Sequence, residues 1–167
     1  AAEGCEIVRL AVPDAAAAEA LGGIKPRSPL PIVADIHFDH RLALAALEAG
    51  VDKLRINPGN IGSRARTRTV AMAAKERGVP IRIGANIGSL SKATLRKFGR
   101  PCAEALVESA LEDVKVLQDL DFHDIVISVK ASEVPMVVEA YAMIAEQVAY
   151  PLHVGVTESG TAWAGGI

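Results

Sequence analysis

The sequence has few cysteines, few aromatic residues and no long apolar run. Its two cysteines, Cys5 and Cys102, lie far apart and in no CxxC or CxxH spacing, which argues against a disulfide framework and against a zinc site. No uninterrupted apolar stretch approaches the roughly 18 residues of a membrane span, and no secretory signal sequence opens the chain. We therefore expect a cytoplasmic protein with reduced thiols and no membrane partner.

A strong excess of charge of either sign is also lacking. The formal net charge is -2 at pH 7 and the sequence pI is about 6.1. Such a chain has no basic field of the kind that attracts nucleic acid, so any anion site must be local. Half of the 167 residues are apolar, as in a globular domain, but the length is below the roughly 250 residues of a complete eight-stranded α/β barrel.

Short β-rich runs alternate with segments of helical periodicity along the whole chain. The strand-length runs, rich in Val, Ile and Leu, are residues 6–12, 32–36, 53–56, 81–85, 124–129 and 152–156. The segments with helical spacing are residues 14–21, 41–49, 63–77, 103–120 and 134–148. Strands joined through helices pair in parallel, so the pattern predicts an α/β fold with about six parallel strands alternating with helices.

The joints between helix and strand resemble one another along the chain. Residues 48–55 parallel residues 76–82, and residues 1–9 have the pattern of a helix end that leads into a strand. The final residues follow a predicted strand, where a further helix would come next. We therefore expect one domain over residues 1–167, a truncated barrel whose first and last units are missing.

Polar side chains recur in the carboxyl halves of the predicted strands, which should otherwise be apolar. Four of the six strands carry or end on a cation: Arg9, Arg55, Arg82 and Lys130. Other polar residues at strand ends are Asp35, His37, Asn57, Asn86, Ser128, His153, Thr157 and Glu158. A closed barrel brings every strand end to one mouth, whereas an open sheet uses only the strands beside its switch point. The pattern therefore favours a partial TIM (β/α)8 barrel.

The four cations outnumber the strand-end acids Asp35 and Glu158 by four to two. A buried cation costs several kcal/mol unless a partner compensates it, so a bound anion would restore the balance. Arginine binds phosphate oxygens in bidentate fashion, and Gly59 and Gly88 would let backbone N–H groups approach closely. These features predict a phosphate or diphosphate site. The alternative is that the cations pair with acids at the barrel rim or point outward.

Two histidines, His37 and His153, lie close to predicted strand ends. Neither has a third ligand at a recognisable spacing, so we expect them to hydrogen-bond substrate and not to hold a metal.

Five blocks of the sequence, in order, resemble the hydroxymethylbutenyl diphosphate synthase family of the non-mevalonate isoprenoid route. They are residues 34–38, 54–61, 82–86 with 88–90, 128–132 and 151–158. The resemblance implies an eight-stranded barrel that binds 2-C-methyl-D-erythritol 2,4-cyclodiphosphate, followed by a smaller domain with a 4Fe-4S cluster on three cysteines and a glutamate. That second domain is absent from these 167 residues, and neither cysteine matches a cluster ligand. Ser159 also departs from the family, where alanine is usual.

The resemblance further implies an iron-sulfur oxidoreductase, in the cytoplasm or in a plastid stroma. Ferredoxin or flavodoxin would supply electrons, and the reaction would remove a hydroxyl as water and open the ring to 4-hydroxy-3-methylbut-2-enyl diphosphate. A homodimer, in which one chain's cluster domain covers the other chain's barrel, would be needed for turnover. The fragment alone is thus expected to be inactive.

Residue roles follow from the same resemblance. Positions matching the four cations would hold the diphosphate, and those matching Asp35, Asn57, Asn86 and Glu158 would belong to the same pocket. Glu158 is our candidate acid for the departing hydroxyl, because a carboxyl in a partly closed site can hold a proton near neutral pH.

Two other functions stay open from the residues alone. A different barrel enzyme acting on a phosphorylated substrate, such as an aldolase, isomerase or pteroate-synthase-like transferase, could use Lys130 as an imine-forming amine. An inactive barrel piece that supplies surfaces for assembly would also explain the alternation, because an incomplete sheet has open edges.

Overall fold

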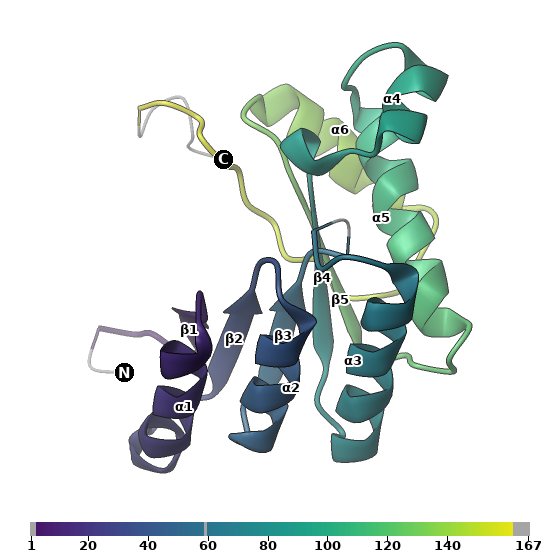
Figure 1. Ribbon diagram of the computed structural model, residues 1–167. Helices are drawn as coiled ribbons and strands as arrows, with labels where there is room; N and C mark the ends of the chain where they lie inside the picture. The colour runs from purple at the N-terminus through teal and green to yellow at the C-terminus, as the bar shows by residue number, and fades with distance from the viewer. Residues whose placement is uncertain (1–2, 59, 162–167) are drawn as a thin grey trace.

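The computed structural model describes residues 3–58 and 60–161, which form a five-stranded parallel sheet with helices on one face (Figure 1). The strands are β1 (Val8–Ala11), β2 (Ile32–Ile36), β3 (Lys53–Ile56), β4 (Ile81–Asn86) and β5 (Ile125–Lys130). The helices are α1 (Ala15–Ile24), α2 (His40–Glu48), α3 (Arg64–Arg77), α4 (Lys92–Phe98), α5 (Ala103–Gln118) and α6 (Val134–Ala145). Two 3-10 turns, η1 (Lys25–Arg27) and η2 (Ile87–Ser89), complete the described elements.

Local sequence signals explain where several helices begin and end. Asp14, Asp39, Ser63 and Ser91 each accept a hydrogen bond from the backbone N–H of the first turn that follows, as N-cap residues do. Helix α3 ends at Gly78, which has a left-handed backbone with φ 64° that is strained for other residues. These signals fix where the helices that connect neighbouring strands begin and end.

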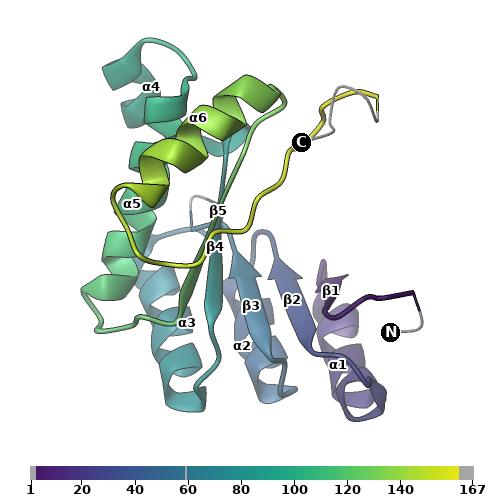
Figure 2. The same cartoon turned by 180° about the vertical axis from the view of Figure 1, so that it is seen from behind.

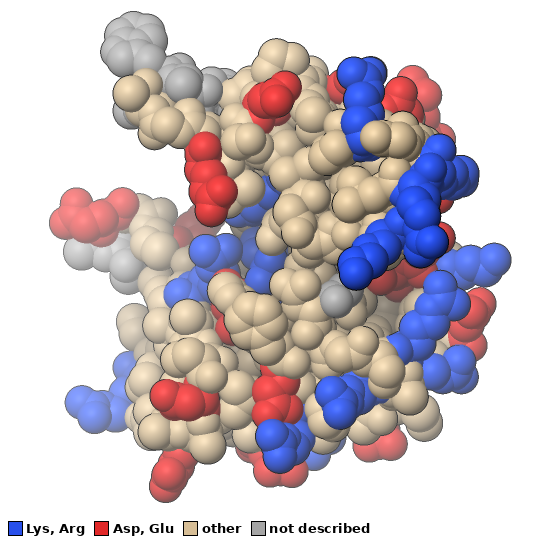
Figure 3. Space-filling model, turned by 45° about the horizontal axis from the view of Figure 1, so that its top comes forward, with Lys and Arg blue, Asp and Glu red and all other residues tan. Residues whose placement is uncertain are grey.

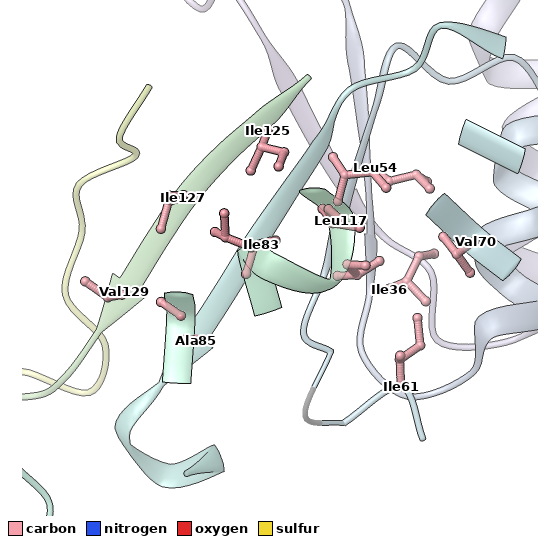
Figure 4. Close-up of a cluster of buried hydrophobic side chains, with 14 of the residues drawn as sticks. Ile36, Leu54, Ile61, Val70, Ile83, Ala85, Leu117, Ile125, Ile127 and Val129 are labelled. Atoms are coloured by element: carbon pink, nitrogen blue, oxygen red, sulfur yellow. The ribbon is translucent and has the colours of Figure 1, made fainter. Parts of the chain in front are cut away.

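The two faces of the sheet differ in chemistry because side chains alternate along each strand. One set of alternate residues is apolar and fully buried under the helices; Ile36, Leu54, Ile83 and Ile127 are 0% exposed. Figure 4 shows these side chains with Val70 of α3 and other apolar neighbours. The opposite face carries the polar residues and is not covered by helices (Figure 2). The hydrophobic core therefore lies between sheet and helices, and the polar face is left for the site.

Strand order β1-β2-β3-β4-β5, all parallel and joined through helices, confirms the expected partial TIM barrel. The expected sixth strand at residues 152–156 is not formed. Only one parallel bridge, between Ile127 and Leu152, connects that segment to the sheet. The sequence also gave no sign of the short helix α4, which follows η2 at the carboxyl end of β4.

Asp113 on α5 gives this fold an expected pH dependence. Burial, and then the charge of Glu112, raise the pKa of Asp113 to about 7, against the opposing effect of Arg64. Because the folded chain holds this proton more tightly than the unfolded chain, stability is lost as pH rises from about 4 to 7. We expect Asp113→Asn to raise the melting temperature by about 3 °C or more at pH 8 and to leave it nearly unchanged at pH 4. Thermal scans at both pH values, with the exposed Asp124→Asn as control, check this; an equal shift at both would contradict it.

Candidate anion site

Polar residues of neighbouring strands lie next to one another on the uncovered face of the sheet. The register pairs Asp35 of β2 with Arg55 of β3, and Arg55 with Arg82 of β4. Two same-face positions further toward the carboxyl ends, Asn86 of β4 pairs with Lys130 of β5. Parallel pairing thus brings residues that are 20 to 44 positions apart in the chain into two rows on one face of the sheet.

Asp35 is the acid at the centre of this group, and it is 7% exposed. Its Oδ1 accepts a hydrogen bond from Arg55 Nη1 at 3.0 Å and lies 3.3 Å from His37 Nε2. Its Oδ2 lies 3.6 Å from Arg9 Nε. The Asp35 carboxylate therefore contacts two arginines and a histidine.

Arg82 and Lys130 form no ion pair among the described residues. Arg82 is 4% exposed, and its buried Nε has no hydrogen-bond partner in the part of the chain described; the same is true of Arg55 Nε. Burial, and then the charges of Arg55 and Arg9, lower the pKa of Arg82 to about 10. Burial and Arg82 likewise lower the pKa of Lys130. Cations without an ion pair that repel one another, together with buried N–H donors that lack an acceptor, are the arrangement expected of an anion-binding site.

A cavity of about 210 Å³ opens between these side chains at the carboxyl ends of the strands. It is lined by the four cations and by Asp35, His37, Asn57, Asn60, Asn86 and Thr157. Figure 3, in which this end of the molecule is tilted forward, shows blue side chains lining a hollow. Four cations and one acid in this lining leave an excess of positive charge that a diphosphate would neutralise.

A second cavity of about 420 Å³ lies beside the first and shares Arg9, Arg82 and Lys130 with it. It also contains Lys53 and His153. Partial burial and the neighbouring cations, Arg82 first, lower the pKa of His153 to about 4. At neutral pH His153 therefore adds hydrogen-bonding capacity and no charge.

The remaining expected residues occupy the edges of the site. Asn57 is buried and donates from Nδ2 to Ser89 Oγ at 3.1 Å, which ties the end of β3 to η2. Ser128 is buried in the β5 row next to Gly84. Gly88 lines the cavity beyond Asn86, whereas Gly59 lies outside the described residues.

Glu158 lies in a neighbouring cavity of about 280 Å³, which shares Asn60, Asn86 and Thr157 with the anion site. Its backbone has φ 53°, in the left-handed region that non-glycine residues seldom adopt. The side chain is exposed, so the described part of the chain does not provide the closure on which the argument for a protonated carboxyl rested. Its position beside the cation cluster stands, and its role stays a prediction.

Gly84 leaves the space that the Arg55 guanidinium occupies. A Cβ at position 84 would lie 2.8 Å from both Nε and Nη2 of Arg55. We expect Gly84→Ala to displace this guanidinium and to weaken diphosphate binding about tenfold, roughly 1.4 kcal/mol. Gly22→Ala on α1, where an added Cβ meets nothing within 4 Å, is the matched control. Equal affinities of the two variants by calorimetric titration would contradict the prediction.

Two residues of the site were not anticipated from the sequence. Lys53 begins β3, and its position at the amino end of a strand gave no reason to place it with residues at carboxyl ends. Tyr141 is on α6 and reaches the backbone of β5 with its hydroxyl. Nothing in the sequence connects Tyr141, within the predicted helix 134–148, to the strand ends.

Groups suited to a metal ion, meaning three or more His, Cys, Asp or Glu side chains together, do not occur in residues 3–58 and 60–161. Cys5 is exposed and Cys102 half-buried, and both are free thiols. No helix in the same two ranges is long and apolar enough to cross a bilayer.

Comparison with known proteins connects this arrangement to one family. Residues 1–167 match the family described as the GcpE TIM-barrel domain. The 4-hydroxy-3-methylbut-2-en-1-yl diphosphate synthase (flavodoxin) of Geobacter sulfurreducens is 60% identical over 167 residues, all of this chain and 47% of that protein. The protein of the same name from Bacillus cereus strain B4264 is 59% identical over 162 residues, 97% of this chain and 44% of its own length. The chain thus spans less than half the length of these relatives.

Among solved structures, the YdjI aldolase from Escherichia coli K12 is similar in fold, with a TM-score of 0.52 and 10% sequence identity. The match covers 93% of this chain and 58% of the aldolase. At this identity the likeness concerns the fold alone.

Proposed function

Because the chain belongs to the GcpE family, whose TIM-barrel domain it matches over its full length, we propose that it is the substrate-binding barrel of a 4-hydroxy-3-methylbut-2-enyl diphosphate synthase. Its ligand would be 2-C-methyl-D-erythritol 2,4-cyclodiphosphate. The complete enzyme would open the ring of this compound reductively, in non-mevalonate isoprenoid biosynthesis.

One observation supports this proposal above the others: Arg82 and Lys130 line the cavity with no ion pair to a described acid, next to two arginines that share Asp35. A cyclic diphosphate carries its negative charges close together, so one such group can contact cations from four different strands. Guanidinium groups supply paired donors for phosphate oxygens, and Lys130 supplies a point charge.

The uncharged polar residues would hold the rest of the substrate. Asn86 and Thr157 line both the anion cavity and the cavity that contains Glu158, and the buried Asn57 lines the anion cavity alone. Amide and hydroxyl groups can donate to and accept from the substrate's hydroxyls. We propose that Glu158 acts as the acid for the departing hydroxyl.

The residues described here do not fit a 4Fe-4S cluster, because the two cysteines lie apart and no other ligand group accompanies them. We propose that the cluster ligands, and with them the redox step, belong to protein outside these 167 residues. A flavodoxin is the donor that the relatives' names indicate. A homodimer that places cluster and barrel together is part of the same proposal.

Calorimetric titration with the cyclodiphosphate tests the binding proposal. We expect one site per chain and an affinity that falls with increasing salt, because several cations contact the ligand. Methylerythritol without phosphate is the control and should not bind. Absence of binding by the cyclodiphosphate at low salt, or equal binding of the control, would contradict the proposal.

One observation also favours an imine-forming lysine: burial and the neighbouring arginines lower the pKa of Lys130, as an amine nucleophile requires. Borohydride trapping in the presence of a phosphorylated aldehyde or ketone separates the two functions. A covalent adduct on Lys130 would favour an aldolase-type enzyme, and its absence the diphosphate-binding role.

A further inference from the structure

The segment that follows α6, residues 151–157, runs along β5 in one parallel register. His153 N–H donates to the Ile127 carbonyl at 2.8 Å, and Thr157 N–H donates to the Ala131 carbonyl at 3.2 Å, with the same offset along the chain. A continuous parallel ladder would place a bond from Val129 N–H to the His153 carbonyl between these two. That bond is replaced in the structure.

The hydroxyl of Tyr141 occupies its place. Val129 N–H donates to Tyr141 Oη at 3.1 Å, and Tyr141 Oη donates to the His153 carbonyl oxygen. Tyr141 comes from α6, on the helix side of the sheet, and is 8% exposed. An oxygen atom inserted into the ladder holds the segment away from β5, which explains why residues 152–156 form a single bridge and no strand.

The point at which the Tyr141 hydroxyl separates the segment from β5 lies directly beside the anion site. Lys130 and Gly155 lie opposite each other in the register, and a Cβ on Gly155 would be 3.4 Å from Lys130 Nζ. The His153 side chain lines the same cavity as Lys130 and Arg82. If the Tyr141 hydroxyl were removed and Val129 N–H bonded directly to the His153 carbonyl, Gly155 would move toward the Lys130 ammonium and His153 would shift relative to Arg82.

We propose that Tyr141 is a positioning residue of the anion site, and that its hydroxyl, by parting the segment 153–156 from β5, sets the positions of Lys130 and His153 around a bound diphosphate. The inference rests on the proposed diphosphate-binding function. It assigns to a helix residue outside the cavity a part in the geometry inside it.

The test compares Tyr141→Phe with Tyr150→Phe in the full chain. Tyr150 is the matched control, because its hydroxyl bonds to Gln118 Nε2 at 3.2 Å and His123 Nδ1 at 3.1 Å, away from the cavity. For folded Tyr141→Phe we expect inorganic diphosphate to bind about tenfold more weakly than to wild type, and Tyr150→Phe to bind as wild type does. Circular dichroism establishes the folded fraction of each variant.

NMR titration of His153 gives a second measurement that a purely structural role would not change. We expect its pKa in Tyr141→Phe to move from the low value of the wild type, and to stay there in Tyr150→Phe. Unchanged affinity together with an unchanged His153 pKa in folded Tyr141→Phe would overturn the inference. If wild type binds neither inorganic diphosphate nor the cyclodiphosphate, the proposed function is contradicted, and the His153 pKa alone decides the inference.

If Tyr141→Phe does not fold, Gly155→Ala replaces it in the test. The added methyl would lie 3.4 Å from Lys130 Nζ, so we expect weaker diphosphate binding from a folded chain. Binding as tight as wild type would overturn the claim that the spacing at this point positions Lys130.

Discussion

Replacing Arg82 by methionine is expected to stabilise the ligand-free chain and to weaken its binding of diphosphate about 30-fold. The buried Nε of Arg82 has no hydrogen-bond partner within residues 3–58 and 60–161, and burial with the charges of Arg55 and Arg9 lowers the pKa of Arg82 to about 10. Exchanging such a charge for an apolar side chain of similar length should raise the free energy of unfolding by about 1 kcal/mol. The lost affinity corresponds to about 2 kcal/mol, as for a hydrogen bond to a charged group.

Chemical denaturation and calorimetric titration measure the two effects separately. Arg77→Met is the control, because Arg77 is exposed at the end of α3 and donates only to the Ala73 carbonyl of its own helix. Opposite changes in stability and affinity would identify Arg82 as a residue kept for its ligand. A variant that loses stability, or that binds diphosphate as wild type does, would show that Arg82 supports the fold instead.

Replacing Asp35 by asparagine is expected to have the opposite effect on stability. Asp35 compensates Arg55 at 3.0 Å and Arg9 at 3.6 Å from a position that is 7% exposed. Asparagine keeps the shape and removes the charge, which leaves the buried Arg55 uncompensated and should lower the free energy of unfolding by about 3 kcal/mol. For a chain of this size the melting temperature should fall by about 6 to 12 °C.

Saturating inorganic diphosphate should recover more stability in Asp35→Asn than in wild type, because the anion then neutralises the charge that Asp35 no longer does. Asp39→Asn is the control. Asp39 pairs with Arg41 on the surface and caps α2, a position that asparagine fills equally well. Thermal scans with and without diphosphate measure the recovery, and equal recovery in all three proteins would contradict the expected exchange of one negative partner for another.

The sequence was sufficient to predict the alternation of elements and the row of cations, because both depend on local patterns. Apolar runs such as 81–85 have the length of a strand. A charged residue inside such a run, as at Arg82, will be buried in any fold that buries the strand, so it requires a compensating partner. Parallel order then follows from the intervening helices. The approach of Asp35, Arg55 and Arg82 to one another is a direct consequence of that order.

What could not be predicted depends on contacts between distant residues. Residues 152–156 have the composition of a strand, but the Tyr141 hydroxyl enters the ladder from a different element. The choice of Arg9 and Arg55 as partners of Asp35, with Arg82 and Lys130 left over, depends on register and side-chain reach. Composition gave a four-to-two ratio with Glu158 included, whereas the cavity itself contains one acid.

A crystal structure of the chain with inorganic diphosphate tests the central claim most directly. We predict phosphate oxygens within hydrogen-bonding distance of the Nε atoms of Arg55 and Arg82, which lack partners in the described residues, and of Lys130 Nζ. Diphosphate bound elsewhere, for example in the groove between α1 and α2, with these groups unoccupied at saturating concentration, would contradict it.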